Sequence, residues 1–209
     1  VMSHSDDQGL VIPPKLAPTQ IVIIPIYRGP EQLEAISLVV EPLLAELRAA
    51  GIRVKFDDRD TYKPGWKFNE YELKGVPIRI AVGPRDLENK QVEIARRDTL
   101  TKETMPMEGL IDRMVGMLSE IQKDLFDAAK RRLDDSIVKV DSWSEFEVAI
   151  KAGGFISAHW DGTAETEERI KKQTKATIRC IPLNNPQENG SCILTGEPSP
   201  ERVLFAIAY

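Results

Sequence analysis

Ile52-Arg53-Val54-Lys55-Phe56 alternates apolar and basic residues and predicts a β-strand, which runs into four charged residues, Asp57-Asp58-Arg59-Asp60. Pro64-Gly65-Trp66-Lys67-Phe68 follows, and a helix is predicted over 65–74. A second strand is predicted over 78–82, closed by Gly83-Pro84. The charged residues are therefore expected at the carboxyl end of a parallel strand, where α/β sheets bind ligands.

The residues before this stretch predict a β-α-β unit. Residues 20–26 are almost continuously apolar, as in a strand buried on both faces. Apolar residues at three- and four-residue spacing predict a helix over 31–50, which Gly51 ends. Because a helix joins them, strands 20–26 and 52–56 are expected to be parallel. A strand over 91–95 and a helix over 107–132 complete a three-layer α/β domain with a mostly parallel mixed sheet.

After Arg132 the pattern restarts on a smaller scale and predicts a small α+β domain. Helices are expected from the N-cap at Ser142 to Ala152 and over 165–172. Strands are expected over 137–140, 155–158, 177–181, 192–194 and 202–207. The predicted organisation is a proline-rich segment 1–18, a first domain 19–132 and a second domain 133–209.

The composition is that of a soluble protein, with 42% hydrophobic and 29% charged residues among 209. No apolar run approaches the roughly 18 residues of a membrane span, so no membrane partner is expected. Cys180 and Cys192 are too few for a secreted disulfide framework, which favours the cytoplasm. The net charge is −5, yet residues 52–97 alone carry +3. Such a segment suits a nucleic acid held on one face, although chance clustering on a solvated surface explains the charge equally well.

Neither a nucleophile motif nor a phosphate-binding glycine loop is found in the sequence. The two histidines, His4 and His159, are interpreted as structural because neither lies near a nucleophile in sequence. Arg59 interrupts the acidic cluster Asp57-Asp58-Asp60, which argues against paired catalytic carboxylates. Acidic and basic groups interleaved with aromatic residues suit the reading of unpaired bases better. The alternative is that the aromatic residues are core and the charges solvated.

The stretch 56–79 resembles the anticodon-binding domain of class II aminoacyl-tRNA synthetases, and its residues are similar to those of the prolyl-tRNA synthetase family. His4-Ser5-Asp6-Asp7-Gln8-Gly9-Leu10-Val11, Glu167–Pro182 and Cys192–Ser199 resemble further segments of that family, of its archaeal and eukaryote-like type. The resemblance implies that residues 1–18 are a remnant of a catalytic domain. Anticodon-contacting or supporting residues are expected at Arg59, Trp66, Lys67, Phe68, Glu70, Glu72, Lys74 and Arg79.

The resemblance further implies an enzyme that attaches proline to its tRNA with ATP and Mg²⁺, as a homodimer. The catalytic residues would lie outside this chain, which is expected to be inactive by itself and to bind no cofactor. The carboxylate of Tyr209 is expected near the catalytic site. Two alternatives remain: an accessory or regulatory anticodon-type domain, and a small-molecule-binding α/β domain without RNA.

In zinc-bearing members of the family, two pairs of cysteines flank the segments that match Glu167–Pro182 and Cys192–Ser199. The matching positions here are Trp160 or Asp161, Thr166, Cys192 and Thr195, so three of four thiolates are missing. Structural zinc requires a closed set of four ligands, and no zinc is therefore expected. Hydrogen bonds from Asp161 and Thr166 are expected instead. The predicted core of this domain consists of Ile156, Ile170, Ile178, Ile181, Ile193, Leu204 and Ile207.

Overall fold

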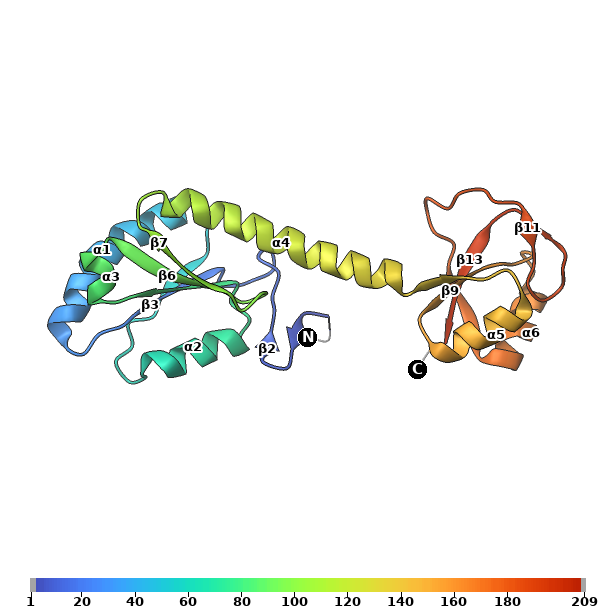
Figure 1. The fold of residues 1–209 in the computed structure, drawn as a ribbon, viewed down its shortest axis with the longest axis horizontal. Coiled ribbons are helices and arrows are strands. Elements are labelled where there is room, and N and C mark those ends of the chain that lie inside the picture. Colours follow the sequence, from blue (N-terminus) through green and yellow to red (C-terminus); the bar gives the residue numbers. More distant parts are fainter. Residues whose placement is uncertain (1–2, 208–209) are drawn as a thin grey trace. The chain divides into compact units, whose positions relative to one another are not determined.

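β3 (Ile21–Pro25) is buried on both faces at the inside of a five-stranded sheet in the computed structural model, which describes residues 3–207 (Figure 1). The strand order is β4-β3-β5-β6-β7. β3 pairs in parallel with β4 and β5, and β6 and β7 are added antiparallel. The other strands are β4 (Val54–Phe56), β5 (Ile78–Val82), β6 (Gln91–Arg96) and β7 (Lys102–Pro106). The mixed α/β class is confirmed, with parallel and antiparallel pairings equally represented in this sheet.

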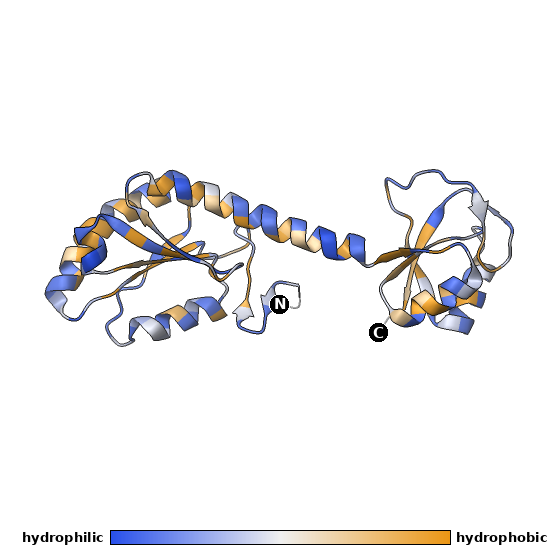
Figure 2. Ribbon diagram, viewed as in Figure 1, coloured by the Kyte–Doolittle hydropathy of each residue, from blue (hydrophilic) through white to orange (hydrophobic). Residues whose placement is uncertain are grey.

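Helices cover both faces of this sheet, so the expected three layers are present. α1 (Pro30–Ala49) and α4 (Leu110–Asp135) pack on one face through a core that includes Ile36 and Met114. α2 (Pro64–Leu73) packs on the other face, where Tyr71 meets Val22 and Ile24. Figure 2 shows the hydrophobic residues on the strands and on the helix surfaces that face them. β3 alternates its side chains between the two cores, which is why its sequence is continuously apolar.

Four elements of this unit have little sequence signal. β7 is largely exposed and lacks an apolar face. α3 (Pro84–Glu88) is one short turn of helix, entered through the Gly83 N–H bonded to the Asp86 carboxylate at 2.8 Å. β1 (Ser5–Asp6) and β2 (Gly9–Leu10) form a hairpin within the segment 1–18, for which no strand was predicted.

The chain divides into two compact units between Asp127 and Ala128, within the continuous helix α4. The second unit contains a four-stranded sheet of order β10-β13-β9-β8. Its strands are β8 (Ile137–Lys139), β9 (Phe155–His159), β10 (Ala176–Cys180) and β13 (Arg202–Ile207). Helices α5 (Trp143–Ala152) and α6 (Ala164–Thr174) bury Phe146, Ile150 and Ile170 in its core. The predicted N-cap of α5 is confirmed, because Ser142 and Glu145 form a reciprocal capping box.

The strand predicted over 192–194 was wrong. These residues form a turn, and the short strands β11 (Gly190–Ser191) and β12 (Pro198–Ser199) pair on either side of it.

The predicted core of the second unit was partly wrong. Ile156, Ile170 and Ile193 are buried, but Ile181 and Ile207 are 47% and 43% exposed. Val203 and Phe205 of β13 lie opposite Ala158 and Ile156 of β9 and share their core face, whereas Leu204 lies opposite Ser157. The register of β13 thus turns Leu204 to the other face of the sheet, since successive side chains alternate.

Among the described residues no helix combines the length and apolar character needed to cross a membrane.

Candidate nucleic-acid interface

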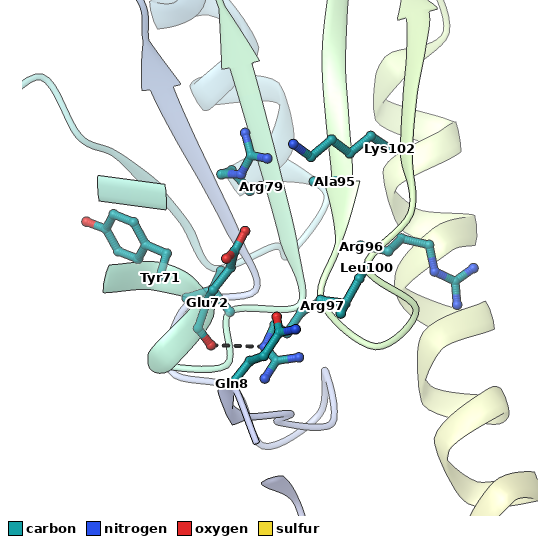
Figure 3. Close-up of a pocket in the computed structure, with 10 residues that line it drawn as sticks. Gln8, Tyr71, Glu72, Arg79, Ala95, Arg96, Arg97, Leu100 and Lys102 are labelled. Atoms are coloured by element: carbon teal, nitrogen blue, oxygen red, sulfur yellow. Dashed lines mark hydrogen bonds between the residues drawn. The ribbon is translucent and has the colours of Figure 1, made fainter. Parts of the chain in front are cut away.

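A small pocket of about 190 Å³ lies at the carboxyl-terminal end of α2, beside the first residues of β5 (Figure 3). Tyr71 and Glu72 of α2 line one side, and Gln8 of the first hairpin another. β5, β6, β7 and the turn between β6 and β7 supply Arg79, Ala95, Arg96, Arg97, Leu100 and Lys102. This volume is below the roughly 300–1,000 Å³ of sites for drug-sized ligands, so the pocket can hold only a small group. It also lies at the amino end of β5, opposite to the expected carboxyl edge.

Arg79 is buried in this pocket with unused hydrogen-bonding capacity. Its side chain is 4% exposed, and its guanidinium carbon lies 3.8 Å from the centroid of the Phe68 ring. Nη1 donates to the Glu93 carboxylate at 3.4 Å, but Nε and Nη2 have no hydrogen-bond partner among residues 3–207. A buried N–H without a partner is costly, so such a group in a native structure calls for a bound water, ion or ligand, or for a source of strain. Phe68 thus holds the guanidinium plane with its free donors beside the pocket.

Glu72 and Lys102 add one acceptor and one donor to the same pocket. The carbonyl of Glu72 accepts from Nε of Arg97 at 2.9 Å, which anchors this end of α2. Neither the Glu72 carboxylate nor the exposed Lys102 ammonium makes an ion pair within the described part of the chain. Arg96 contributes differently, since its guanidinium binds Asp98 and Asp124 and points away toward α4 in Figure 3. Glu72 and Lys102 thus bring an unpaired carboxylate and an unpaired ammonium to the pocket, and Arg79 lines it with Nε and Nη2 buried and unpartnered within residues 3–207.

A second polar group surrounds the buried carboxylate of Asp57, at the carboxyl end of β4. Arg59 binds this carboxylate with Nε at 2.8 Å and Nη2 at 2.6 Å. The Tyr71 hydroxyl donates at 3.1 Å, and the Lys67 ammonium lies 3.7 Å away while donating to the Asp57 carbonyl at 2.9 Å. Burial raises the pKa of Asp57, but these donors outweigh it and lower that pKa to about 2. Burial and the nearby Asp57 charge raise the pKa of Tyr71 to about 12.

This network corrects the interpretation of Asp57 and Lys67 as groups that touch a ligand. Lys67 is only 1% exposed and Asp57 is also buried, so both are fully engaged within the protein. Glu70 and Lys74 extend the network at the surface, where Glu70 accepts from Arg59 at 2.6 Å and from Lys74 at 2.5 Å. Lys67 can therefore influence a ligand only by supporting α2.

Trp66 lies at the other end of α2 from the pocket. It stacks on Tyr62 with ring centroids 3.8 Å apart, and Arg59 lies over both rings. Trp66 and Glu72 are six positions apart in α2, a rise of about 9 Å. Of the predicted site residues, the structure brings Phe68, Glu72 and Arg79 together at the pocket and groups Arg59, Lys67, Glu70 and Lys74 around Asp57.

Lys102 and Arg97 were missed at the sequence level. Lys102 lies on β7, whose largely exposed residues show no alternating pattern, so no signal was available for it. Arg97 is 3% exposed, but an arginine in a charged stretch carries no mark of burial in the sequence.

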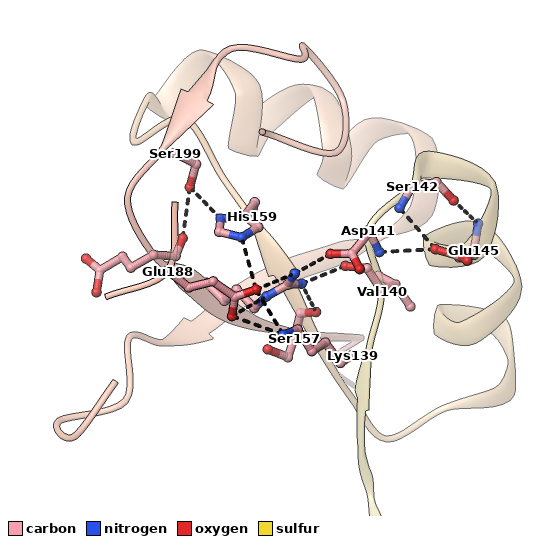
Figure 4. Close-up of polar contacts among 11 residues, drawn as sticks. Lys139, Val140, Asp141, Ser142, Glu145, Ser157, His159, Glu188 and Ser199 are labelled. Atoms are coloured by element: carbon pink, nitrogen blue, oxygen red, sulfur yellow. Dashed lines mark hydrogen bonds and ion pairs between the residues drawn. The ribbon is translucent and has the colours of Figure 1, made fainter. Parts of the chain in front are cut away.

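The second unit contains a buried polar cluster with a serine, a histidine and a carboxylate (Figure 4). Nδ1 of His159 lies 3.1 Å from Oγ of Ser199, and Nε2 lies 4.0 Å from the Glu188 carboxylate. The Ser199 hydroxyl donates to the Glu201 carbonyl at 2.8 Å, so its single hydrogen is committed and His159 must donate from Nδ1. Burial and the nearby Arg202 charge lower the pKa of His159. The arrangement cannot activate Ser199 as a nucleophile, which agrees with a structural role for His159.

The residues at the positions that hold zinc in other family members form a hydrogen-bonded cluster around Asp161. Its carboxylate accepts from the hydroxyls of Thr166 at 2.7 Å, Thr195 at 2.9 Å and Thr163 at 2.9 Å. Cys192 is the one thiol of the set, and it is buried. Three hydroxyl groups already engage the single carboxylate, so these residues do not form the closed, thiolate-rich shell that structural zinc prefers. The expected hydrogen bonding of Asp161 and Thr166 is present.

Comparison with known proteins bears directly on both units. Residues 20–117 match the family described as anticodon binding domain, and residues 143–209 match the family described as prolyl-tRNA synthetase, C-terminal. The chain carries the anticodon-binding and C-terminal domains of the prolyl-tRNA synthetase family. The pocket residues from Tyr71 to Lys102 all lie within the first matched range.

Curated relatives carry the name proline–tRNA ligase. The chain is 59% identical to the one from Porphyromonas gingivalis, 57% to that from Christiangramia forsetii and 54% to that from Cytophaga hutchinsonii. Each comparison covers the whole chain but only 42% or 43% of the relative. The chain thus spans less than half the length of these prolyl-tRNA synthetases. Tyr209, expected to act near their catalytic site, lies outside the described residues.

Proposed function

We propose that this chain binds the anticodon loop of proline tRNA, as the tRNA-reading part of an enzyme that joins proline to that tRNA with ATP and Mg²⁺. The single observation that carries the proposal is Arg79, buried in a pocket of an anticodon-binding domain with Nε and Nη2 unpartnered among residues 3–207. The joining reaction would belong to the part of the relatives' length that this chain does not span. A homodimeric, cytoplasmic enzyme remains part of the proposal.

The donor and acceptor pattern of the pocket fits guanine. Arginine or lysine donates to O6 and N7 of guanine, the commonest specific contact with that base. A carboxylate such as that of Glu72 can accept from the N1–H and N2–H₂ groups on the opposite edge of an unpaired guanine. Arg79, Lys102 and Glu72 therefore offer complementary partners for one flipped-out base. The same cationic rim argues against the alternative of a small-molecule-binding α/β domain without RNA.

The test is binding of short anticodon stem-loop RNAs to the 209-residue chain. A loop with the two guanines shared by proline anticodons should bind more tightly than loops in which either guanine is replaced by adenine. We expect about a 5- to 100-fold loss when the guanine that occupies the pocket is replaced, because a good base-specific pair contributes roughly 1–3 kcal/mol. Fluorescence anisotropy at about 0.15 M salt measures the dissociation constants, since phosphate binding dominates at lower salt.

A tRNA stem-loop of unrelated anticodon is the control for contacts to the RNA backbone. Equal affinity for all of these RNAs would refute the proposal and favour a domain without anticodon recognition.

We also propose that the second unit is stable without zinc. In this proposal the hydrogen-bonded cluster around Asp161 takes the place of the metal. Asp161→Ala removes the shared acceptor of that cluster and should lower the free energy of unfolding of this unit by about 1–3 kcal/mol. A strong chelator should leave the melting temperature unchanged, and elemental analysis should find far less than one zinc per chain. Glu197→Ala, a charge removal on the neighbouring exposed turn, is the matched control. A stoichiometric zinc content or a drop in melting temperature with chelator would contradict this prediction.

A further inference from the structure

The first hairpin packs backbone to backbone against the end of α2. Gly9 has φ +131°, and a Cβ atom there would lie 2.6 Å from Cα of Leu73. Gly75 has φ +68°, and its Cβ would lie 2.7 Å from the backbone of Leu10. Larger side chains at both glycines are thus excluded twice, by the backbone conformation and by the close approach. The hairpin is seated at a defined place beside the pocket.

Asp6 connects this hairpin to the pocket through Arg97. The Asp6 carboxylate accepts two hydrogen bonds from Arg97, at 2.7 Å and 2.6 Å, and a third from the Gln8 N–H at 2.9 Å. Nε of the same guanidinium donates to the carbonyl of Glu72. Arg97 is 2% exposed at its side chain, whereas Asp6 is 42% exposed. One carboxylate therefore fixes both the hairpin turn that bears Gln8 and the arginine that anchors Glu72.

We propose that the hairpin Ser5–Leu10 forms a wall of the anticodon pocket, in which Asp6 is a positioning residue that holds Glu72 through Arg97 and holds Gln8 toward the bound base. The proposal rests on the function proposed above, and it names residues outside the matched anticodon-binding range 20–117. To hydrogen-bond a guanine edge, Glu72 must be held in a defined position. The Arg97 guanidinium supplies this constraint, because it binds the Asp6 carboxylate with two nitrogens and the Glu72 carbonyl with the third. Contacts to the RNA phosphates do not depend on this connection.

Asp6→Asn should therefore weaken base discrimination more than overall RNA binding. Asparagine accepts less strongly and cannot neutralise Arg97, so the guanidinium loses its bidentate partner and Glu72 loses its fixed position. We expect the ratio of dissociation constants, adenine-substituted loop over guanine loop, to fall about 3- to 10-fold, the scale of coupling between directly connected residues. Asp7→Asn removes the same charge from the adjacent exposed residue and is the matched control.

Two further variants separate positioning from folding. Arg97→Lys keeps the positive charge but removes the bidentate guanidinium, so it should lower the ratio of dissociation constants as Asp6→Asn does. The double variant Asp6→Asn/Arg97→Lys should lower this ratio no further. Gln8→Ala alters only an exposed side chain that lines the pocket, and it should reduce the ratio about 2- to 3-fold with an unchanged melting temperature.

The outcomes distinguish this inference from the proposed function. If the unmodified chain discriminates between the loops and both Asp6→Asn and Gln8→Ala discriminate equally well, the inference is overturned while anticodon binding stands. If the unmodified chain does not discriminate, anticodon recognition itself fails, and the inference fails with it. Loss of discrimination in Asp6→Asn but not in Asp7→Asn supports the hairpin as a wall of the pocket.

Discussion

Replacing Arg79 with methionine should weaken binding of the guanine-containing anticodon loop about 10- to 100-fold without destabilising the protein. The affinity falls because a bidentate arginine–guanine contact, worth roughly 1–3 kcal/mol, is lost. The stability is retained because Nε and Nη2 of Arg79 are buried without a partner among residues 3–207, and methionine removes that desolvation cost. Methionine also preserves packing against Phe68. Binding by fluorescence anisotropy and unfolding in urea are the two measurements.

Arg48→Met is the matched control, since it removes the same charge from an exposed position on α1. This control should cause only a small, salt-dependent loss of RNA affinity. It should leave the preference for the guanine-containing loop unchanged. Destabilisation of the Arg79 variant by several kcal/mol would mean that Arg79 is a structural residue and that its free N–H groups have another role. Unchanged binding would remove the pocket from the interface.

Asp57→Ala should lower the free energy of unfolding by about 3–5 kcal/mol, the largest stability effect that we expect in this chain. The substitution leaves the ammonium of Lys67 buried without its counter-charge and the Tyr71 hydroxyl without its acceptor. α2 would lose its attachment to the carboxyl end of β4. Urea unfolding followed by circular dichroism measures the loss.

Asp58→Ala, one residue further along and exposed, should change stability by less than about 0.5 kcal/mol. The double variant Asp57→Ala/Lys67→Met should be more stable than Asp57→Ala, because it removes the uncompensated charge as well. The pKa of Asp57 is lowered from 3.8 to about 2, so its stabilising effect should be complete above pH 4 and lost as the pH falls toward 2. An Asp57→Ala variant as stable as the unmodified chain would contradict this account of the network.

Local pattern was sufficient for most of the fold. The continuously apolar stretch at β3, the helical spacing in α1 and the capping box of α5 each identify an element within a few residues of its bounds. These signals are strong because burial of one face imposes a period of two or about 3.6 on the sequence. Family membership was likewise predictable, since it rests on strings of residues and not on their arrangement in space.

The candidate site was predictable only as a set of residues. Arg79, Glu72 and Phe68 were identified, but the sequence could not separate them from Lys67, which is charged in the same stretch and yet buried. Whether a charged side chain faces a ligand or a neighbouring carboxylate depends on which strands lie side by side. That order, β4-β3-β5-β6-β7, also brings Lys102 and Arg97 to the pocket.

The sequence alone therefore determined the element order, the fold class and the family, because each depends on residues close together along the chain. The tertiary structure was needed to show that the pocket lies at the amino end of β5, that Asp57 belongs to the interior, and that Gln8 of the first hairpin lines the pocket. Asp6 and Arg97 are 91 residues apart, and the local sequence around either residue does not predict that they pair. Hydrogen bonds between distant segments form only once the sheet and α2 have brought their backbones together.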